Sequence, residues 1–402
     1  MKRILFVASL ATLLAAGCQK TEIINPVGGP SLSFTTGMGK LTKAEGTADA
    51  DGAGESNLQA QDFRVWAYCA YDDTNTTDVE TNTVYDGMEM LPVTYQAGAE
   101  GSEGTWSTEQ EYYWPGVNKN LKFFAVSSSS LFADSEGQTD GTETVTVSLT
   151  STDDSSVPSL SIPSFTVNSD SPNEDLMVAD FVEQNQSTKA VDLKFRHALC
   201  KVQFVFKTLA EADAKVYVQS LEAENLINTG SLTIAADDTQ TADESDTDEG
   251  TTEGSEPTSP VTTQIAFTWN TDSENNTATF EDDYTTAIET EGEGADSDWP
   301  TEFDNIGTDA DVDKTALKLT ETAQEFATWL MVPQSVEDKT FKVTYLMGKK
   351  QFTNIFKLSA ENLTEWGVNQ FVKYTITLAP NRISFNPSVE DWDEATDVEH
   401  EN

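Results

Sequence analysis

Short segments in which two sets of side chains alternate run along almost the whole chain. Within residues 63–71, the set that begins with Phe63 and Val65 alternates with the set that begins with Arg64 and Trp66. A period of two is what a β-strand produces. Most segments are rich in β-branched or aromatic residues and are bounded by Gly, Pro, Asn, Asp or Ser, as strands are. No long stripe of period 3.6 occurs, so the sequence predicts an all-β fold.

The expected strands fall into two groups. They cover residues 63–71, 120–127, 143–150 and 161–167 in the first half, and 190–195, 199–207, 215–221, 231–235, 264–269, 329–333, 340–347, 352–358 and 371–378 in the second half. Many short strands separated by turns are typical of β-sandwiches. The length of 402 residues suits two domains. We therefore predict an N-terminal sandwich at 61–198 and a C-terminal sandwich at 199–402, which includes acidic insertions and an acidic tail.

The first residues have the organisation of an export signal. Lys2 and Arg3 precede an uncharged apolar run at 4–16, which is followed by Gly17 and Cys18. The run is too short to span a bilayer. Small residues directly before a cysteine are what a lipoprotein signal peptidase requires, and diacylation plus an amide-linked chain gives stable anchoring. We expect a lipoprotein signal peptide at 1–17 and lipidation, with palmitate among the chains, at Cys18; ordinary secretory cleavage is the alternative.

The segment at 18–60 is expected to be a tether that contains one short strand, at 32–35. Between this strand and residue 60 the sequence is rich in Gly, Ala, Asp and Glu. Such a composition supplies little apolar surface for folding.

The net charge excludes one class of partner. The formal charge is −46, and such a surface repels phosphate backbones, so no nucleic-acid binding is expected. Acids are concentrated in 237–256 and 281–313, which contain many Asp and Glu residues and no Lys or Arg. Like charges repel and few apolar residues are present, so these stretches are expected to form solvated loops or disordered insertions.

Divalent cation binding is the functional alternative for the acidic stretches. Asp309, Asp311 and Asp313 have the alternate spacing of a calcium loop. However, Lys314 occupies the position of the glycine of an EF-hand loop, and Thr320 occupies the closing position that needs an acid. No metal site is predicted.

Few residues are available for catalysis. The two histidines are His197, between two strand patterns, and His400, in the acidic tail. Neither has ligands or catalytic partners at a recognisable spacing, so His197 is expected to be a structural histidine, hydrogen-bonded where two strands meet. Cys69 and Cys200 lie in apolar strand patterns and are expected to be buried thiols, with a disulfide as the alternative. We predict no catalytic residue, no cofactor and no enzymatic activity.

Clustered aromatic residues allow two interpretations. Tyr112, Tyr113 and Trp114 precede the strand expected at 120–127, and further tryptophans are scattered along the chain. Exposed rings can stack on sugars, which is the basis for a lipid-anchored glycan-binding protein as the alternative function. Large aromatic residues more often fill a core, and that interpretation is preferred here.

Several segments together resemble the fimbrillin-like family, which comprises lipoprotein-derived subunits of type V pili and related proteins. The resemblance covers nearly the whole mature chain and starts with the small residues before Cys18. The other segments are 32–35 (LSFT), 41–44 (LTKA), 63–68 (FRVWAY), 112–115 (YYWP), 121–125 (LKFFA), 175–179 (DLMVA), 191–199 (VDLKFRHAL), 366–367 (WG), 374–378 (YTITL) and 389–392 (VEDW). Each motif alone is a weak signal, but their order is fairly specific.

The resemblance implies two tandem transthyretin-like β-sandwiches and proteolytic removal of an N-terminal strand before polymerisation. Relatives that polymerise are commonly cut after an arginine, and the corresponding position here is Lys43, followed by Ala44. Either a protease that accepts lysine acts, or the protein is a tip, anchor or non-polymerising relative that keeps its lipid.

Removal of the strand would leave an edge for β-strand addition from another molecule. The candidate donor is the C-terminal segment with Ile383, Phe385, Val389 and Trp392. Alternatively, this segment completes its own C-terminal sandwich.

The sequence therefore predicts a structural or adhesive protein of the cell outer membrane, a subunit or accessory component of a fimbria. Its expected partners are other fimbrial subunits and, through Cys18, the membrane lipid, with a ligand on a host or bacterial surface as a further expectation.

Overall fold

The structure is a computed structural model. It describes residues 30–38, 58–70, 83–99, 104–115, 120–132, 145–150, 157–186, 188–209, 215–237, 260–271, 276–284, 315–347, 350–379 and 382–392. The predicted signal peptide, Cys18, Lys43, Ala44, Asp309, Asp311, Asp313 and His400 lie outside these ranges, as do most residues of the acidic stretches.

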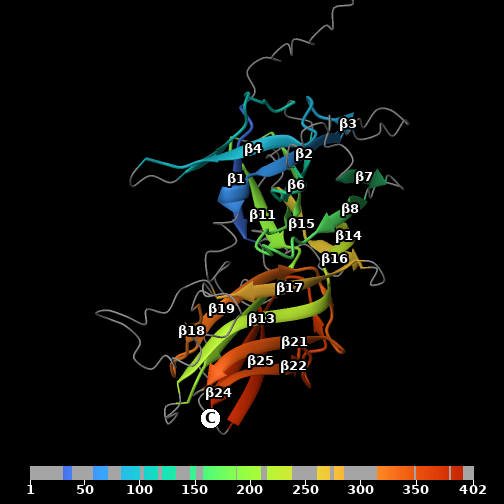
Figure 1. Ribbon diagram of the computed structural model, residues 1–402. Helices are drawn as coiled ribbons and strands as arrows, with labels where there is room; N and C mark the ends of the chain where they lie inside the picture. Colours follow the sequence, from blue (N-terminus) through green and yellow to red (C-terminus); the bar gives the residue numbers. More distant parts are fainter. Residues whose placement is uncertain are drawn as a thin grey trace, which may run out of the picture.

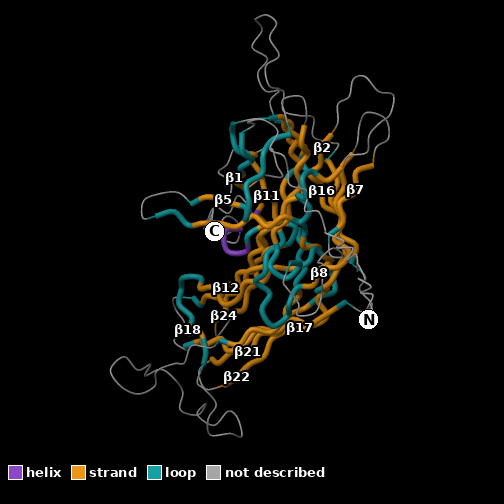
Figure 2. Tube along the Cα trace, turned by 90° about the horizontal axis from the view of Figure 1, so that it is seen from above, coloured by secondary structure: helices purple, strands orange, loops and turns teal. Residues whose placement is uncertain are grey.

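The all-β prediction is confirmed. The described residues form 25 strands, and their one α-helical stretch is a single turn at 58–61 (Figures 1 and 2). No helix among the described residues is long and apolar enough to cross a membrane. The strands lie in two parts, one above the other in Figure 1.

The first part contains a large sheet and a small one. The large sheet has ten strands, with the main order β1-β11-β9-β6-β2-β4-β5. The bounds of these strands are β1 (Phe34–Met38), β11 (Val191–His197), β9 (Met177–Ala179), β6 (Asn120–Ser127), β2 (Phe63–Ala70), β4 (Leu91–Gln96) and β5 (Thr105–Ser107), with β3 (Thr83–Val84), β10 (Phe181–Asn185) and β15 (Val261–Thr263) beside them. The small sheet has the order β16 (Ile265–Asn270), β14 (Thr229–Ala236), β8 (Val157–Thr166) and β7 (Thr146–Thr150).

The second part also contains two main sheets. One has the order β19 (Gln324–Met331), β12 (Cys200–Lys207), β24 (Gln370–Ala379) and β25 (Arg382–Asp391). The other has the order β17 (Thr277–Asp283), β13 (Val216–Ile227), β21 (Thr340–Met347) and β22 (Lys350–Lys357), and β18 (Leu317–Lys318) also pairs with β13. The short strands β20 (Gln334–Ser335) and β23 (Glu365–Trp366) form a separate pair.

The pairing of strands crosses the boundary expected between residues 198 and 199. Only Asn228 separates β13, in the second part, from β14, which pairs with β8 in the first part. Strand β15 pairs with β10, and β16 pairs with β14. Residues after 199 therefore complete both sheets of the first part, so neither part is one continuous segment.

The ten-stranded sheet is buried on both faces. On one face Phe63 and Val65 of β2 and Phe123 of β6 belong to a core cluster that is confined to the first part. On the other face Trp66 and Phe124 belong to a larger cluster that continues into the second part. Alternate side chains of one strand enter different cores, as the pleat of a strand dictates.

Leu58 also lies in the first cluster and is fully buried. The predicted tether at 18–60 therefore contributes to the core at its end. The sequence pattern missed this contact because a single apolar residue on one helical turn has no period.

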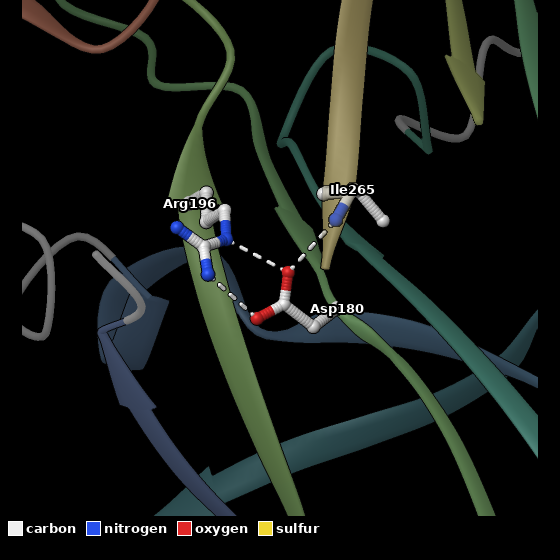
Figure 3. Close-up of polar contacts among 3 residues, drawn as sticks. All are labelled: Asp180, Arg196 and Ile265. Atoms are coloured by element: carbon white, nitrogen blue, oxygen red, sulfur yellow. Dashed lines mark hydrogen bonds and ion pairs between the residues drawn. The ribbon is translucent and has the colours of Figure 1, made fainter. Parts of the chain in front are cut away.

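A buried ion pair of the large sheet also binds the start of β16 (Figure 3). Arg196 Nε and Nη2 of β11 lie 2.7 and 2.9 Å from the two carboxylate oxygens of Asp180, which precedes β10. The amide of Ile265, the first residue of β16, donates to Asp180 Oδ1 over 3.3 Å. Burial raises the pKa of the Asp180 carboxyl, and the bonds from Arg196 and Ile265 oppose that shift. One carboxylate thus joins the start of β16 to the segments around Asp180 and Arg196.

Candidate functional site

The N-terminal strand β1 lies at one edge of the ten-stranded sheet. It pairs in parallel with β11, in a register that runs from Phe34 opposite Val191 to Met38 opposite Phe195. The other pairings of this sheet are antiparallel. The sequence predicted a strand at 32–35; the observed strand starts two residues later and ends at Met38. Among the described residues β1 pairs with β11 alone, so one ladder holds it.

Two side chains anchor β1 in the core. Phe34 and Met38 are each only 6% exposed, whereas Thr35 between them is exposed. The ring of Phe34 makes edge-to-face contacts with Phe63, at a centroid distance of 6.3 Å, and with Phe123, at 6.0 Å. Such contacts add to the burial of apolar area. The side chains that β1 covers are therefore apolar and include the aromatic rings of Phe63 and Phe123.

Polar contacts hold β1 at its middle and at the segment that precedes it. Before the strand, the amide of Leu32 donates to the carbonyl of Tyr112 over 2.7 Å, and the carbonyl of Ser33 accepts from the amide of Val191 over 2.8 Å. Within the strand, the indole N–H of Trp106 donates to Thr36 Oγ1 over 2.9 Å. Both β1 and the segment that precedes it are thus attached to the sheet.

Gly37 lets a charged side chain lie close to β1. A Cβ atom at this position would lie 2.8 Å from Lys194 Nζ. Lys194 also pairs with Asp192 over 3.0 Å at the surface. Because Gly37 has no side chain, the side chain of Lys194 can lie against β1 at this position.

The C-terminal segment forms the last strand of its own sheet. Strand β25 pairs antiparallel with β24 over ten residues, from Arg382 opposite Ala379 to Asp391 opposite Gln370. Phe385 packs against Phe341 and Tyr374, with centroid distances of 5.5 and 5.3 Å. In this structure the predicted donor segment occupies the place given by the alternative interpretation.

The predicted donor residues differ in how deeply they are buried. Ile383 and Val389 are 40% and 42% exposed, because β25 is the edge strand of its sheet. Trp392, which follows the strand, is fully buried, and its amide donates to the carbonyl of Asn369 over 3.0 Å. Phe385 and Trp392 therefore fix the segment.

Trp392 packs against His197, the one histidine among the described residues. Its indole stacks on His197, and His197 Nδ1 donates to Asp175 Oδ2 over 2.9 Å. His197 and Asp175 are fully buried. His197 is therefore the structural, hydrogen-bonded histidine that the sequence predicted.

Three further residues that the sequence singled out, Tyr112, Trp114 and Cys200, are also buried. Tyr112 and Trp114 are buried in the first core cluster, which confirms core packing for both. Cys200 is free and buried, and burial raises the pKa of its thiol well above the ordinary value, as expected for an inert packed thiol. Cys69 lies in β2.

Among the residues that the structure describes, no group of three or more His, Cys, Asp and Glu residues could hold a metal ion.

Sequence reasoning missed the partners of these buried groups. Asp175 and His197 lie in two of the segments that carry the family resemblance, as do Arg196 and Trp392, but nothing in the pattern pairs them. The signal that was available is local: a charged residue flanked by buried apolar residues needs a partner.

These observations define an all-β protein in which β1, the first described strand, lies at the edge of a sheet and is anchored by two buried apolar side chains. The sequence profile of the fimbrillin-like family matches residues 50–392. The chain therefore belongs to the fimbrillin-like family. Membership implies a location at the cell surface and a structural role rather than an enzymatic one.

Solved structures with a similar fold include fimbrial and adhesion proteins. A fimbrial protein from Bacteroides vulgatus is 14% identical, with a TM-score of 0.45, over 90% of this chain and 99% of that chain. A candidate cell adhesion protein from Bacteroides uniformis is 15% identical, with a TM-score of 0.41, over 91% of this chain and 98% of that chain. No curated protein matches the sequence.

Proposed function

We propose that the protein is a subunit or an accessory (tip or anchor) component of a fimbria that is assembled by addition of a β-strand from a neighbouring molecule. The observation that supports this proposal most strongly is β1. It is a short edge strand near the N-terminus, it is held by one ladder, and its two anchors, Phe34 and Met38, fill an apolar groove. The bond between Lys43 and Ala44 follows it in the sequence, so cleavage there would separate β1 from the rest of the chain.

Loss of β1 would create an acceptor for another strand. The outer edge of β11 would lose its backbone partners from Phe34 to Met38, and the rings of Phe63 and Phe123 would lose their contact with Phe34. An unpaired edge next to an exposed apolar groove is the arrangement that β-strand addition uses. A replacement strand needs apolar side chains on one face, four residues apart, to reproduce the anchors.

The candidate donor is the β25 segment of a neighbouring molecule. Ile383, Phe385 and Val389 are paired with Leu378, Ile376 and Val372 of β24, so all three point to the same face. Donation requires β25 to leave β24 and requires Phe385 and Trp392 to leave their core sites. Each buried side chain of this kind contributes about 1.5–3 kcal/mol, so the acceptor groove must compensate for that loss.

Anchoring follows from the same proposal. Lipid on Cys18 would hold the uncut protein in the outer membrane, and a subunit cut after Lys43 would lose that anchor. An anchor or tip component would keep it. We further propose that the two parts are transthyretin-like sandwiches that exchange segments, and that the assembled surface binds a ligand on a host or bacterial cell.

The experiment compares the chain that begins at Gln19, which keeps β1, with the chain that begins at Ala44, which lacks it. Polymers that survive mild denaturation and are visible by electron microscopy are expected only from the second. If the chain that begins at Ala44 stays monomeric at high concentration, the proposal is wrong.

A disulfide tests the donor more cleanly than truncation, because deletion of 382–402 also removes the buried Phe385 and Trp392. Thr377 and Ser384 are direct partners in the β24–β25 ladder, and the Cβ atoms of such pairs lie close enough for a disulfide. In the chain that begins at Ala44, Thr377→Cys with Ser384→Cys should block polymerisation when oxidised and permit it when reduced. Polymerisation of the oxidised form would exclude β25 as the donor.

A further inference from the structure

The first and the last described strands have similar sequences. Residues 32–38, which contain β1, read LSFTTGM, and residues 383–389 of β25 read ISFNPSV. The aligned pairs of like residues are Leu32 and Ile383, Ser33 and Ser384, Phe34 and Phe385, Gly37 and Ser388, and Met38 and Val389. Both segments thus carry an aromatic residue and, four positions later, a non-aromatic apolar one, which is the spacing of the two anchors of β1.

The matched apolar side chains of each segment share one face. In β1, Phe34 and Met38 are buried, and Leu32, two residues before Phe34, packs against the same core cluster of the first part. In β25, the three matched apolar residues lie opposite apolar residues of β24 and point to one face. Because side chains alternate along a strand, residues 383–389 in the place of β1 would turn the same three positions toward the core.

The proline of β25 fits the backbone of this place. The carbonyl of Ser33 accepts from the amide of Val191, and the bonding residues alternate along each strand of a parallel ladder. The amide of Thr36, three residues after Ser33, is therefore directed away from β11. Pro387 aligns with Thr36, so its missing amide hydrogen removes no bond to β11. What Pro387 does not reproduce is the hydrogen bond from the indole of Trp106 to Thr36 Oγ1.

The outer face of the place of β1 accepts the serine that aligns with Gly37. A Cβ atom at Gly37 would lie 2.8 Å from Lys194 Nζ. The side chain of Lys194 is 42% exposed, and its flexible end can move away from a small residue. The hydroxyl of Ser388 can also accept a hydrogen bond from the ammonium group. A small polar residue is thus compatible with this position.

We propose that residues 383–389 of a second copy of the chain occupy the place of β1, in the register of β1 and parallel to β11. Phe385 then lies at the site of Phe34, and Val389 lies at the site of Met38. This register rests on the proposed function, because β1 has to leave first, and it adds the orientation and the alignment of the donor strand.

The exchange of strands replaces one set of aromatic contacts by another. In its own sheet Phe385 packs against Phe341 and Tyr374. At the site of Phe34 it meets the two rings that contact Phe34 in β1. Similar contacts at the start and at the end of the exchange limit the loss that accompanies departure from β24.

The first experiment asks whether the sequence of β25 fits the place of β1 in the full chain from Gln19. Residues 32–38 are replaced by ISFNPSV, and cysteines are placed at position 35 and at Asp192, its partner in the ladder. Partners in neighbouring strands lie within the range of a disulfide. The grafted chain should form this disulfide about as fast as the ungrafted chain with Thr35→Cys and Asp192→Cys. Failure to form it would overturn the proposed register and leave the proposed function standing.

Two controls make the graft specific. A permuted graft, SIFNPVS, keeps the composition but turns serines toward the core at both ends, and it should form the disulfide at least about tenfold more slowly. Lys194→Cys in place of Asp192→Cys lies two residues further along β11 and should also react slowly with position 35. Equal rates for the permuted graft, or a preference for position 194, would overturn the register. Circular dichroism checks that each variant folds.

The second experiment asks whether a second copy supplies the strand. A chain from Gln19 with a specific protease site in place of residues 40–43 is folded intact and then cut, so that β1 can leave. In polymers of the variant Asp192→Cys with Asn386→Cys, oxidation should link neighbouring copies into a covalent ladder on denaturing gels. Lys194→Cys with Asn386→Cys is the matched control and should give no ladder. Polymers that lack the first cross-link would overturn this register alone, whereas the absence of polymers would overturn the proposed function with it.

Discussion

The indole of Trp392 lies flat on the imidazole of His197, with ring centroids 3.7 Å apart and planes 5° from parallel. Trp392 directly follows β25 and His197 is the last residue of β11, so the stack joins the C-terminal end of the second part to the large sheet of the first part. Asp175 also holds the imidazole, through a hydrogen bond with Nδ1. The last described residue thus holds the two parts together.

Removal of the indole should therefore destabilise the whole chain. Trp392→Ala is expected to lower the free energy of unfolding by about 3–5 kcal/mol, because a large buried ring leaves a cavity. Trp392→Phe should lose clearly less, and Val389→Ala, at an exposed position of the same segment, should have a small effect. Urea titration followed by fluorescence of the remaining tryptophans measures all three. Equal losses for Trp392→Ala and Val389→Ala would contradict this account of the stack.

Removal of one partner of the buried ion pair should destabilise the protein more than replacement of both partners by apolar residues. Arg196→Met leaves the carboxylate of Asp180 buried without its partner, and a loss of about 3–5 kcal/mol is expected. The double variant Asp180→Leu with Arg196→Met removes both charges and should be more stable than the single variant. Urea titration at neutral pH decides the order, and a double variant that is the less stable of the two would show that the pair contributes more than charge compensation.

Alkaline pH should reveal the burial of Tyr68. Burial, with the negative charge of Glu89, raises the pKa of Tyr68 from 10.0 to about 12. Between these two values the folded chain keeps a proton that the unfolded chain has released, so stability falls as the pH rises, by at most about 1.4 kcal/mol per pH unit. Tyr68→Phe should fall less steeply in this range than the unmodified protein. Parallel slopes in urea titrations from pH 9.5 to about 12 would contradict the assignment.

The acidic segment between β14 and β15 should be dispensable for folding. Ala236 at the end of β14 is the ladder partner of Ile265 at the start of β16, so the two ends of the excursion are close together. Replacement of 239–259 by a short Gly-Ser linker should change the melting temperature little in moderate salt, because longer loops cost little extra closure entropy. A loss of several kcal/mol would show that the segment packs or binds a structural cation.

Lipidation depends on one residue. In cells that export the protein, Cys18→Ala should abolish incorporation of labelled palmitate and leave unprocessed precursor or released protein. Cys69→Ala serves as the control and should be labelled normally. Labelling of the Cys18→Ala variant would exclude the predicted lipid site.

The alternation of side chains in the sequence predicted individual strands well where a strand coincides with one uninterrupted pattern. Residues 120–127 and 340–347 are strands with the predicted bounds. Burial alternates along most of 340–347, whereas residues 123–127 are all buried because their sheet is covered on both faces. Strand β25 continues through Pro387, since the strand lies at an edge and a proline there removes no inner ladder bond. The acidic stretch expected to be a loop from residue 281 begins inside β17, where Asp282 accepts a hydrogen bond from the indole of Trp329.

Long-range pairing could not be predicted from one sequence. The period of two says that β14 is a strand, but it carries no information about which strand lies beside it, and the return of β14 to β8 became visible only in the structure. The same holds for the site. Phe34 could be predicted as apolar and strand-like, yet its parallel register with β11 depends on contacts more than 150 residues apart in the sequence.

The path of the chain through the two parts also sets an order of events in time. A chain that emerges from a ribosome or an export channel with its N-terminus first presents β7 and β8 long before β14 and β16, their partners in the small sheet. Folding of the first part can therefore be completed only after residue 270 has emerged, when β12 and β13 of the second part are already outside. Slow closure of such distant pairs leaves strand edges open in the meantime. The newly exported chain thus passes through an interval in which a chaperone or a neighbouring chain has access to edges that the finished fold conceals.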